Sequence, residues 1–170
     1  GLKDGQFIAV YQPIFSVADG KLTGFEALAR WQHPVRGLVS PLEFIPVLEE
    51  HGLITQLTKS MLELALAQLA TWRVKHPDLY VSVNLSARDI QEPDFIRVLE
   101  HLLHHYQVPS NRVLLEITET VLLADWHNAS KSINDLKALG VKLALDDFGT
   151  GYSSLSYLSK IQASTLKVDR

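Results

Sequence analysis

The alternation of apolar β-type runs with helical segments constrains the fold of this chain most strongly. The apolar runs predict strands at residues 7–15, 22–31, 79–85, 112–118, 141–147 and 165–169. The segments between them predict helices from residue 41 to a stop at Gly52, and at 53–75, 93–106, 126–139 and 152–160. After the first two strands the order is strand, helix, strand with short connections. Such an order requires a parallel sheet with helical crossovers.

Two architectures satisfy this order, a (β/α) barrel and an open doubly wound sheet. A complete eight-stranded barrel typically takes about 250 residues. As a barrel, six strands in 170 residues would make an α/β fold of the (β/α)8 TIM-like barrel type, truncated to about six strands, and the open sheet remains the alternative at this point. The chain starts without methionine and stops directly after an apolar run. We therefore expect one domain over residues 1–170, with the last two β/α units missing.

The first two predicted strands are joined by a turn containing Asp19 and Gly20. Strands joined by so short a turn are antiparallel neighbours, so the sheet should begin with a hairpin. Residues 33–41 read as a loop. At the end of that loop, Ser40, Pro41 and Glu43 match a helix start with a capping box.

The apolar positions of the first two predicted helices give the expected core. They are Phe44, Ile45, Val47, Leu48, Leu57, Met61, Leu64, Leu66, Leu69 and Trp72.

The composition limits which metal ligands and which binding partners the chain can have. The chain has no cysteine, so a metal site would need oxygen or imidazole ligands, which favours hard cations. A net charge of −3 argues against binding of long nucleic acid. No apolar run has the length of a membrane span, and no signal pattern opens the chain. We expect a cytoplasmic domain, whose parent protein could still be membrane-anchored.

The run that ends in Asp146 and Asp147 is followed by a glycine-spaced loop. Two adjacent carboxylates at a strand end repel each other unless a cation or protons neutralise them, which predicts a divalent-metal site. The alternative is a polar strand-to-helix turn that uses Asp and Gly for their turn chemistry.

Polar residues also interrupt or end the other apolar strands. They are Glu26, Asn84, Glu116, Lys167 and Asp169. The C-terminal ends of barrel strands converge on one mouth, where such enzymes place their chemistry. Carboxylate and amide oxygens suit Mg²⁺ or Mn²⁺. Taken singly, Asn84 could be a turn residue, Glu116 could pair with an arginine, and Lys167 could reach solvent.

A set of motifs in order along nearly the whole chain resembles the EAL family of cyclic di-GMP phosphodiesterase domains. The motifs are Tyr11-Gln-Pro-Ile14, Glu26-Ala-Leu-x-Arg-Trp31, His33-Pro34, Phe44-Ile-Pro46, Asn84-Leu-Ser86, Glu116-Ile-Thr-Glu119, Asp146-Asp-Phe-Gly-Thr-Gly-Tyr-Ser-Ser-Leu155 and Lys167-Val-Asp169. The resemblance implies a (β/α)8 barrel with an antiparallel first strand. It also implies hydrolysis of cyclic di-GMP to linear pGpG.

The resemblance assigns roles to individual residues. One Mg²⁺ or Mn²⁺ would be held by Glu26, Asn84, Glu116 and Asp146, and Asp146 with Asp147 would share in a second. Lys167 would orient or help deprotonate the attacking water, supported by Asp169. The substrate would contact Gln12, Leu28 and Arg30. Glu119 would steady the loop that contains Gly149, Thr150 and Gly151. For Arg30, a surface ion pair is the alternative.

Other expectations concern activity and partners. The family carries a further glutamate and a glutamine on its last strands, which are absent from these residues, so we expect the 170-residue chain itself to be impaired. Ca²⁺ should bind but inhibit. The resemblance implies a homodimer and sensory domains elsewhere in the parent chain. An inactive cyclic di-GMP receptor or scaffold, and an unrelated barrel enzyme acting on another phosphorylated substrate, are the rival functions. His101, His104 and His105 are expected on a solvated helix face.

Overall fold

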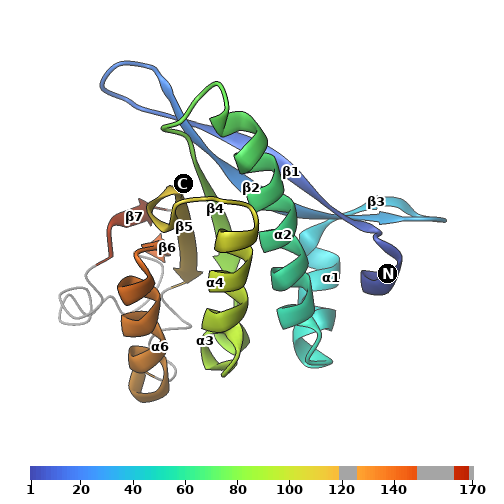
Figure 1. Cartoon of the computed structure of the whole chain (residues 1–170). Helices are drawn as coiled ribbons and strands as arrows, with labels where there is room; N and C mark the ends of the chain where they lie inside the picture. Colours follow the sequence, from blue (N-terminus) through green and yellow to red (C-terminus); the bar gives the residue numbers. More distant parts are fainter. Residues whose placement is uncertain (119–125, 149–162, 169–170) are drawn as a thin grey trace.

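A computed structural model describes residues 1–118, 126–148 and 163–168 of the chain (Figure 1). The described strands are β1 Phe7–Phe15, β2 Leu22–His33, β3 Gly37–Val39, β4 Tyr80–Leu85, β5 Val113–Thr118, β6 Lys142–Phe148 and β7 Thr165–Val168. The described α-helices are α1 Pro41–Glu50, α2 Ile54–Arg73, α3 Ala87–Gln91, α4 Phe95–His105 and α6 Trp126–Leu139. Short 3₁₀ turns lie at Leu2–Asp4 and Ser110–Arg112.

The strands form one sheet in the order β1-β2-β4-β5-β6-β7, with β3 paired to β2. β1 runs antiparallel to β2, with Gln12 opposite Glu26, which confirms the predicted hairpin. From β2 to β7, neighbouring strands of this order are parallel. Figure 1 shows α1, α2, α4 and α6 in a row along one side of the sheet. The predicted α/β architecture with an antiparallel first strand is therefore what the chain adopts.

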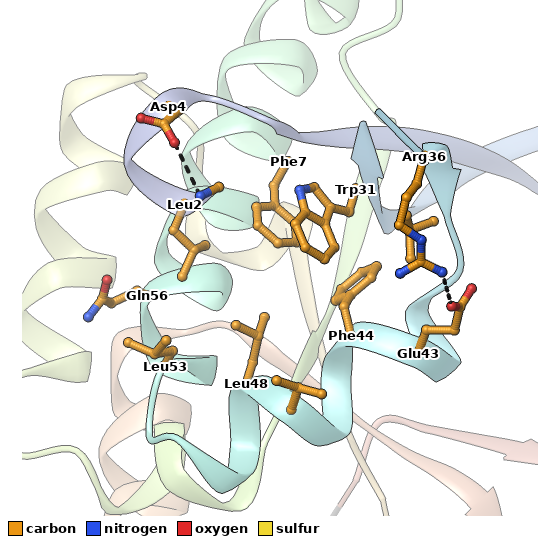
Figure 2. A pocket seen from close by; sticks show the side chains of 13 residues that line it. Leu2, Asp4, Phe7, Trp31, Arg36, Glu43, Phe44, Leu48, Leu53 and Gln56 are labelled. Atoms are coloured by element: carbon orange, nitrogen blue, oxygen red, sulfur yellow. Dashed lines mark hydrogen bonds and ion pairs between the residues drawn. The ribbon is translucent and has the colours of Figure 1, made fainter. Parts of the chain in front are cut away.

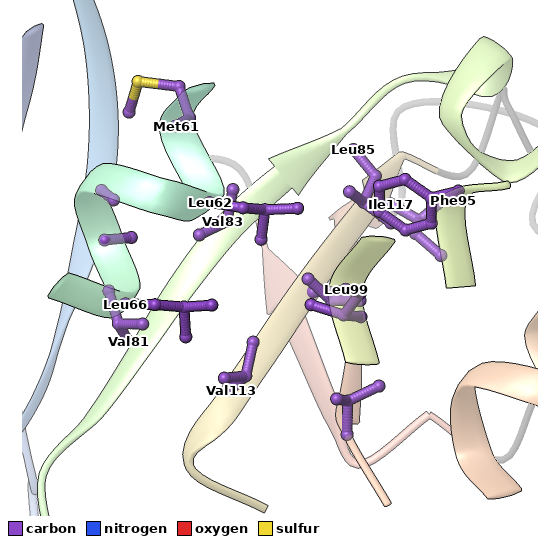
Figure 3. Packing of buried hydrophobic residues seen from close by; sticks show 14 of the residues in the cluster. Met61, Leu62, Leu66, Val81, Val83, Leu85, Phe95, Leu99, Val113 and Ile117 are labelled. Carbon is purple, nitrogen blue, oxygen red and sulfur yellow. The ribbon is translucent and has the colours of Figure 1, made fainter. Parts of the chain in front are cut away.

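The core lies between the sheet and this row of helices. Figure 3 shows Leu62 and Leu66 of α2 beside Val81 and Val83 of β4, with Leu99 of α4 close to β5. These five side chains are almost completely buried. Burial of apolar surface is the main favourable contribution to folding. Here it determines which face of each strand is turned toward the helices and which face is turned away from them.

The structure corrects several expectations about local structure. Residues 33–41 are not only a loop, because Gly37, with φ +72°, reverses the chain so that β3 pairs with the end of β2. The described residues therefore contain seven strands rather than six. The capping box at Ser40 is wrong as well, since the Ser40 side chain makes no cap hydrogen bond and Glu43 pairs with Arg36.

The helical predictions were mostly right in position. Helix α3 was missed because it is only five residues long. Two expected core residues are exposed, Leu64 by 39% and Val47 by 52%, because α1 and α2 turn those positions away from the sheet. Trp72 is half-buried and packs on Tyr11 and Phe25. The predicted helix at residues 152–160 lies outside the described residues. Among the described helices, none has the length and apolarity to cross a membrane.

Gly24 of β2 lies opposite Tyr80 of β4, in close contact with it. A Cβ atom at this position would lie 2.6 Å from the Tyr80 carbonyl oxygen and 2.8 Å from Tyr80 Cδ1. We expect Gly24→Ala to lower the free energy of unfolding by about 2 kcal/mol, because neighbouring backbone must shift to make room. Urea denaturation measures this change.

The matched control is Gly20→Asn in the hairpin turn. Gly20 has φ +66° and open space around its Cβ position, and asparagine tolerates this backbone region. A change within about 0.5 kcal/mol is expected there. Equal destabilisation by both substitutions would contradict the close approach of β2 and β4.

Candidate active site

The polar strand-end residues meet at one edge of the sheet. Asn84 of β4 lies opposite Glu116 of β5 in the parallel register, and Thr118 of β5 lies opposite Asp146 of β6. Glu26 of β2 lies beside Ser82 of β4. The parallel register thus carries the side chains of successive strands to the same end of the sheet, as the sequence predicted.

The Lys167 ammonium on β7 is the point on which these side chains converge. Its Nζ lies 2.6 Å from Glu116 Oε2, 3.0 Å from Glu26 Oε2 and 3.4 Å from Asp146 Oδ2. The Asn84 amide donates to Glu26 Oε1 at 3.0 Å. Five polar residues from five strands therefore form one connected polar cluster. Neither an arginine partner for Glu116 nor solvent for Lys167 accounts for these contacts.

Burial of the cluster affects the protonation of Lys167. The Glu116 side chain is only 1% exposed, whereas that of Lys167 is 30% exposed. Burial by itself lowers the pKa of the Lys167 ammonium, but its hydrogen bonds to Glu116 and Glu26 and their negative charge outweigh this and raise the pKa above its usual value. In this arrangement Lys167 keeps its proton. It can donate hydrogen bonds and balance negative charge.

The cluster has the chemistry of a site for a hard cation. In residues 1–118, 126–148 and 163–168, no three His, Asp or Glu side chains stand close enough together to hold a metal ion. The Lys167 ammonium lies among three carboxylates, so one positive charge faces three negative ones. Glu116 Oε1 is buried and has no hydrogen-bond partner within the described residues. Carboxylate and amide oxygens with excess negative charge fit Mg²⁺ or Mn²⁺.

Asp147 follows Asp146 in an unusual backbone conformation. Its φ is +55°, in the left-handed region, and its N–H donates to Asp146 Oδ1 at 3.0 Å. The register between β6 and β7 also shifts between Leu145 and Phe148. Asp146 is thereby held in the cluster, while Asp147 is exposed at the edge of the sheet. A left-handed non-glycine residue next to a functional group is a common form of local strain at active sites.

A cavity of about 270 Å³ opens beside the cluster, and its lining includes two of the three predicted substrate contacts, Leu28 and Arg30, together with Asn84. Its other wall comes from α1 and α2, with Ile45 and Met61 among the apolar residues. Arg30 Nη1 donates to the Ala29 carbonyl at 2.8 Å, so its guanidinium is anchored at this wall. Gln12, the third predicted contact, lies opposite Glu26 on β1 and is exposed.

A second cavity of about 500 Å³ lies away from this chemistry (Figure 2). It is lined by Phe7, Trp31 and Phe44, with the Arg36–Glu43 pair at its rim. No predicted site residue lines it. Because Arg30 and Trp31 are neighbours on one strand, their side chains leave opposite faces of β2. We therefore place the candidate site at the smaller cavity, where the charged groups gather.

The sequence missed one polar network beneath the smaller cavity. Asp89 is completely buried, and its Oδ2 accepts hydrogen bonds from the Ser86 N–H, the Ser86 hydroxyl and the Thr58 hydroxyl at 2.7, 2.6 and 2.9 Å. Burial raises the pKa of the Asp89 carboxyl, and the bonds from Ser86 and Thr58 oppose this rise. The signal in the sequence was Ser86-x-x-Asp89 directly after a strand, which is a helix-capping pattern with aspartate in place of glutamate.

The remaining predicted residues fall into two groups. Glu119, Asp169, Gly149, Thr150 and Gly151 lie outside the described residues. His101, His104 and His105 are exposed on α4, which confirms the solvated helix face.

The chain is similar in sequence to known proteins. A family model described as EAL domain matches residues 1–170. An uncharacterized signaling protein of Caulobacter vibrioides is 43% identical over 170 residues, which cover 100% of this chain and 21% of that protein. The cyclic di-GMP phosphodiesterase PA2567 of Pseudomonas aeruginosa is 38% identical over 170 residues, covering 100% of this chain and 29% of that protein. The chain thus spans between a fifth and a third of the length of these relatives.

Two solved structures share the fold. The PaMucR phosphodiesterase in complex with c-di-GMP has a TM-score of 0.93 and 37% identity, covering 99% of this chain and 68% of that chain. The EAL enzyme Bd1971, in its cAMP- and cyclic-di-GMP-bound form, has a TM-score of 0.90 and 34% identity, covering 98% of this chain and 46% of that chain. These likenesses confirm the predicted TIM-like barrel class.

Proposed function

Because this chain belongs to the EAL domain family, we propose that it carries the metal- and substrate-binding residues of a phosphodiesterase that hydrolyses cyclic di-GMP to linear pGpG. The observation that supports this most directly is the cluster of Glu26, Glu116 and Asp146 around Lys167, next to a cavity lined by Arg30. PA2567 is named a cyclic di-GMP phosphodiesterase, and PaMucR was solved with c-di-GMP.

In this proposal the carboxylate cluster holds the cations. Glu26, Asn84, Glu116 and Asp146 would hold one Mg²⁺ or Mn²⁺, and Asp146 and Asp147 would share in a second. Bound cations would supply Lewis acidity for the phosphate and a water activated for attack. The carboxylates already gather around a positive charge, since the Lys167 ammonium lies within 3.4 Å of three of them.

The other residues of the site would bind and orient the substrate. Arg30 carries a planar guanidinium that fits a phosphate or the edge of a guanine. Leu28 and Gln12 would contact the dinucleotide beside it. Lys167, as a protonated donor, would orient the attacking water and balance negative charge that develops on the phosphate. Water would lose a proton as its oxygen adds to phosphorus, the bond from phosphorus to the 3′ oxygen would break, and that oxygen would take up a proton.

The test uses the full-length protein that contains this chain. We expect conversion of cyclic di-GMP to pGpG with Mg²⁺ or Mn²⁺, loss of turnover in EDTA, and inhibition by Ca²⁺, whose looser geometry positions the reacting groups poorly. Anion-exchange chromatography separates substrate from product. Tight binding of cyclic di-GMP without product would contradict the enzyme and support the receptor or scaffold function.

Two further expectations stay predictions. A homodimer would form at the face near the loop after Asp147, and sensory domains would lie elsewhere in the longer parent protein. Sedimentation equilibrium of the full-length protein with and without cyclic di-GMP tests the first. The chain completes its barrel, in this proposal, within the longer protein.

A further inference from the structure

We propose that Asp89 is a positioning residue that fixes Asn84 and one wall of the substrate cavity through Ser86 and Thr58, an inference that rests on the proposed function. The two hydroxyl residues that Asp89 binds, Ser86 and Thr58, both line the 270 Å³ cavity. Asp89 itself lies behind this wall and is completely buried. A single carboxylate oxygen thus ties together wall residues from two separate elements.

The connection to Asn84 is short. Asn84 is followed by Leu85, which is buried at the end of β4, and then by Ser86. Asp89 Oδ2 binds both the backbone N–H and the hydroxyl of Ser86, and Ser86 Oγ in turn accepts from the Asp89 N–H at 3.3 Å. These contacts fix the direction in which the chain leaves β4. The direction of the chain after β4 matters for the site because it affects the position of Asn84, whose amide donates a hydrogen bond to Glu26 Oε1.

Thr58 supplies the second attachment. It lies on α2, 31 residues earlier in the sequence, and its hydroxyl donates to the same Asp89 oxygen. Helix α2 packs against β4 and forms part of the cavity wall. The network therefore ties the end of β4 to α2, one residue after the strand ends at Leu85.

Helix capping alone does not account for the complete burial of the Asp89 carboxylate. A cap can be made by an exposed carboxylate, and burying a carboxylate is costly unless its oxygens are satisfied. Asp89 Oδ1 is buried and has no hydrogen-bond partner within the described residues. A buried carboxylate of this kind next to the cavity suits a residue that orients the side chains of the site through its hydrogen bonds. Such outer partners typically change metal affinity or activity by about 10–100-fold when removed.

The test compares Asp89→Ala and Asp89→Asn with Asp94→Ala in the full-length protein. Asp94 precedes α4, has a side chain that is 60% exposed, and forms a surface pair with Arg97. Calorimetry gives the dissociation constants of Mn²⁺ and of cyclic di-GMP, and thermal midpoints are recorded in parallel. We expect Asp89→Ala to weaken Mn²⁺ binding by about tenfold. Asp89→Asn, which keeps an oxygen acceptor for Ser86 and Thr58, should lose less, and Asp94→Ala should match the wild type.

A lower thermal midpoint with unchanged dissociation constants would overturn the proposal, since a purely structural role moves only the midpoint. If Asp89→Ala does not fold, Thr58→Val replaces it, with Thr71→Val as its control. The Thr71 hydroxyl is exposed on the same helix and donates only to the Ala67 carbonyl one turn earlier. Equal dissociation constants for Thr58→Val and Thr71→Val would also overturn the proposal. Because binding is measured, a wild type that binds without turnover contradicts the phosphodiesterase and leaves the Asp89 comparison intact.

Discussion

Replacement of Glu26 by alanine should abolish nearly all hydrolysis of cyclic di-GMP, with kcat reduced by about 10²- to 10³-fold, as for loss of a group that stabilises the transition state directly. Glu26 is the side chain that joins two parts of the cluster. It accepts from the Asn84 amide through Oε1 and from the Lys167 ammonium through Oε2. Its loss removes one expected metal ligand and frees both partners to move.

The measurement is steady-state turnover at saturating Mn²⁺, with circular dichroism to show that the variant is folded. Glu63→Ala is the control, because Glu63 is exposed on α2 and does not line the 270 Å³ cavity. Its rate should equal that of the wild type. An unchanged rate in Glu26→Ala would remove Glu26 from the metal site and leave the receptor function as the better proposal.

Strand positions were predictable because the sheet buries continuous apolar runs. In β5, Val113 to Ile117 are all buried, including Glu116, so an apolar run with one carboxylate already marks a buried strand. Short elements were not predictable. The three residues of β3 carry no periodic signal, and they form a strand only because Gly37 turns them back onto β2.

That these polar residues would lie together was predictable, but their contacts were not. Polar residues at strand ends pointed to Glu26, Asn84, Glu116, Asp146 and Lys167 as one group. Which of them touch is a property of the folded sheet, since Lys167 reaches Glu26 across 141 positions and Glu116 across 51. Asp89 was missed for the same reason, because its partner Thr58 lies on a helix that the sequence showed only as apolar core.

Lys167→Met should destabilise the metal-free protein and, in contrast to the wild type, make its stability strongly dependent on divalent cations. Removing the ammonium leaves Glu26, Glu116 and Asp146 facing one another with no positive charge between them. Breaking one side of a buried ion pair costs about 3–5 kcal/mol, and partial exposure of Lys167 places the expected loss near the lower end. Turnover should be lost as well, because the proposed donor to the attacking water is gone.

Thermal unfolding of the full-length protein in EDTA and in Mn²⁺ measures this effect. In EDTA the variant should unfold well below the wild type, and Mn²⁺ should raise its midpoint more than that of the wild type, because no ammonium competes for the carboxylates. Lys21→Met is the control, since Lys21 pairs with Asp19 on the hairpin at 78% exposure and such surface pairs contribute about 0–1 kcal/mol. Equal midpoints for the two variants in EDTA would show that the Lys167 ammonium is not what holds the carboxylates together. Turnover of Lys167→Met at saturating Mn²⁺ separates the two proposed roles of Lys167, because a metal can replace its charge among the carboxylates but not the proposed hydrogen bond to water.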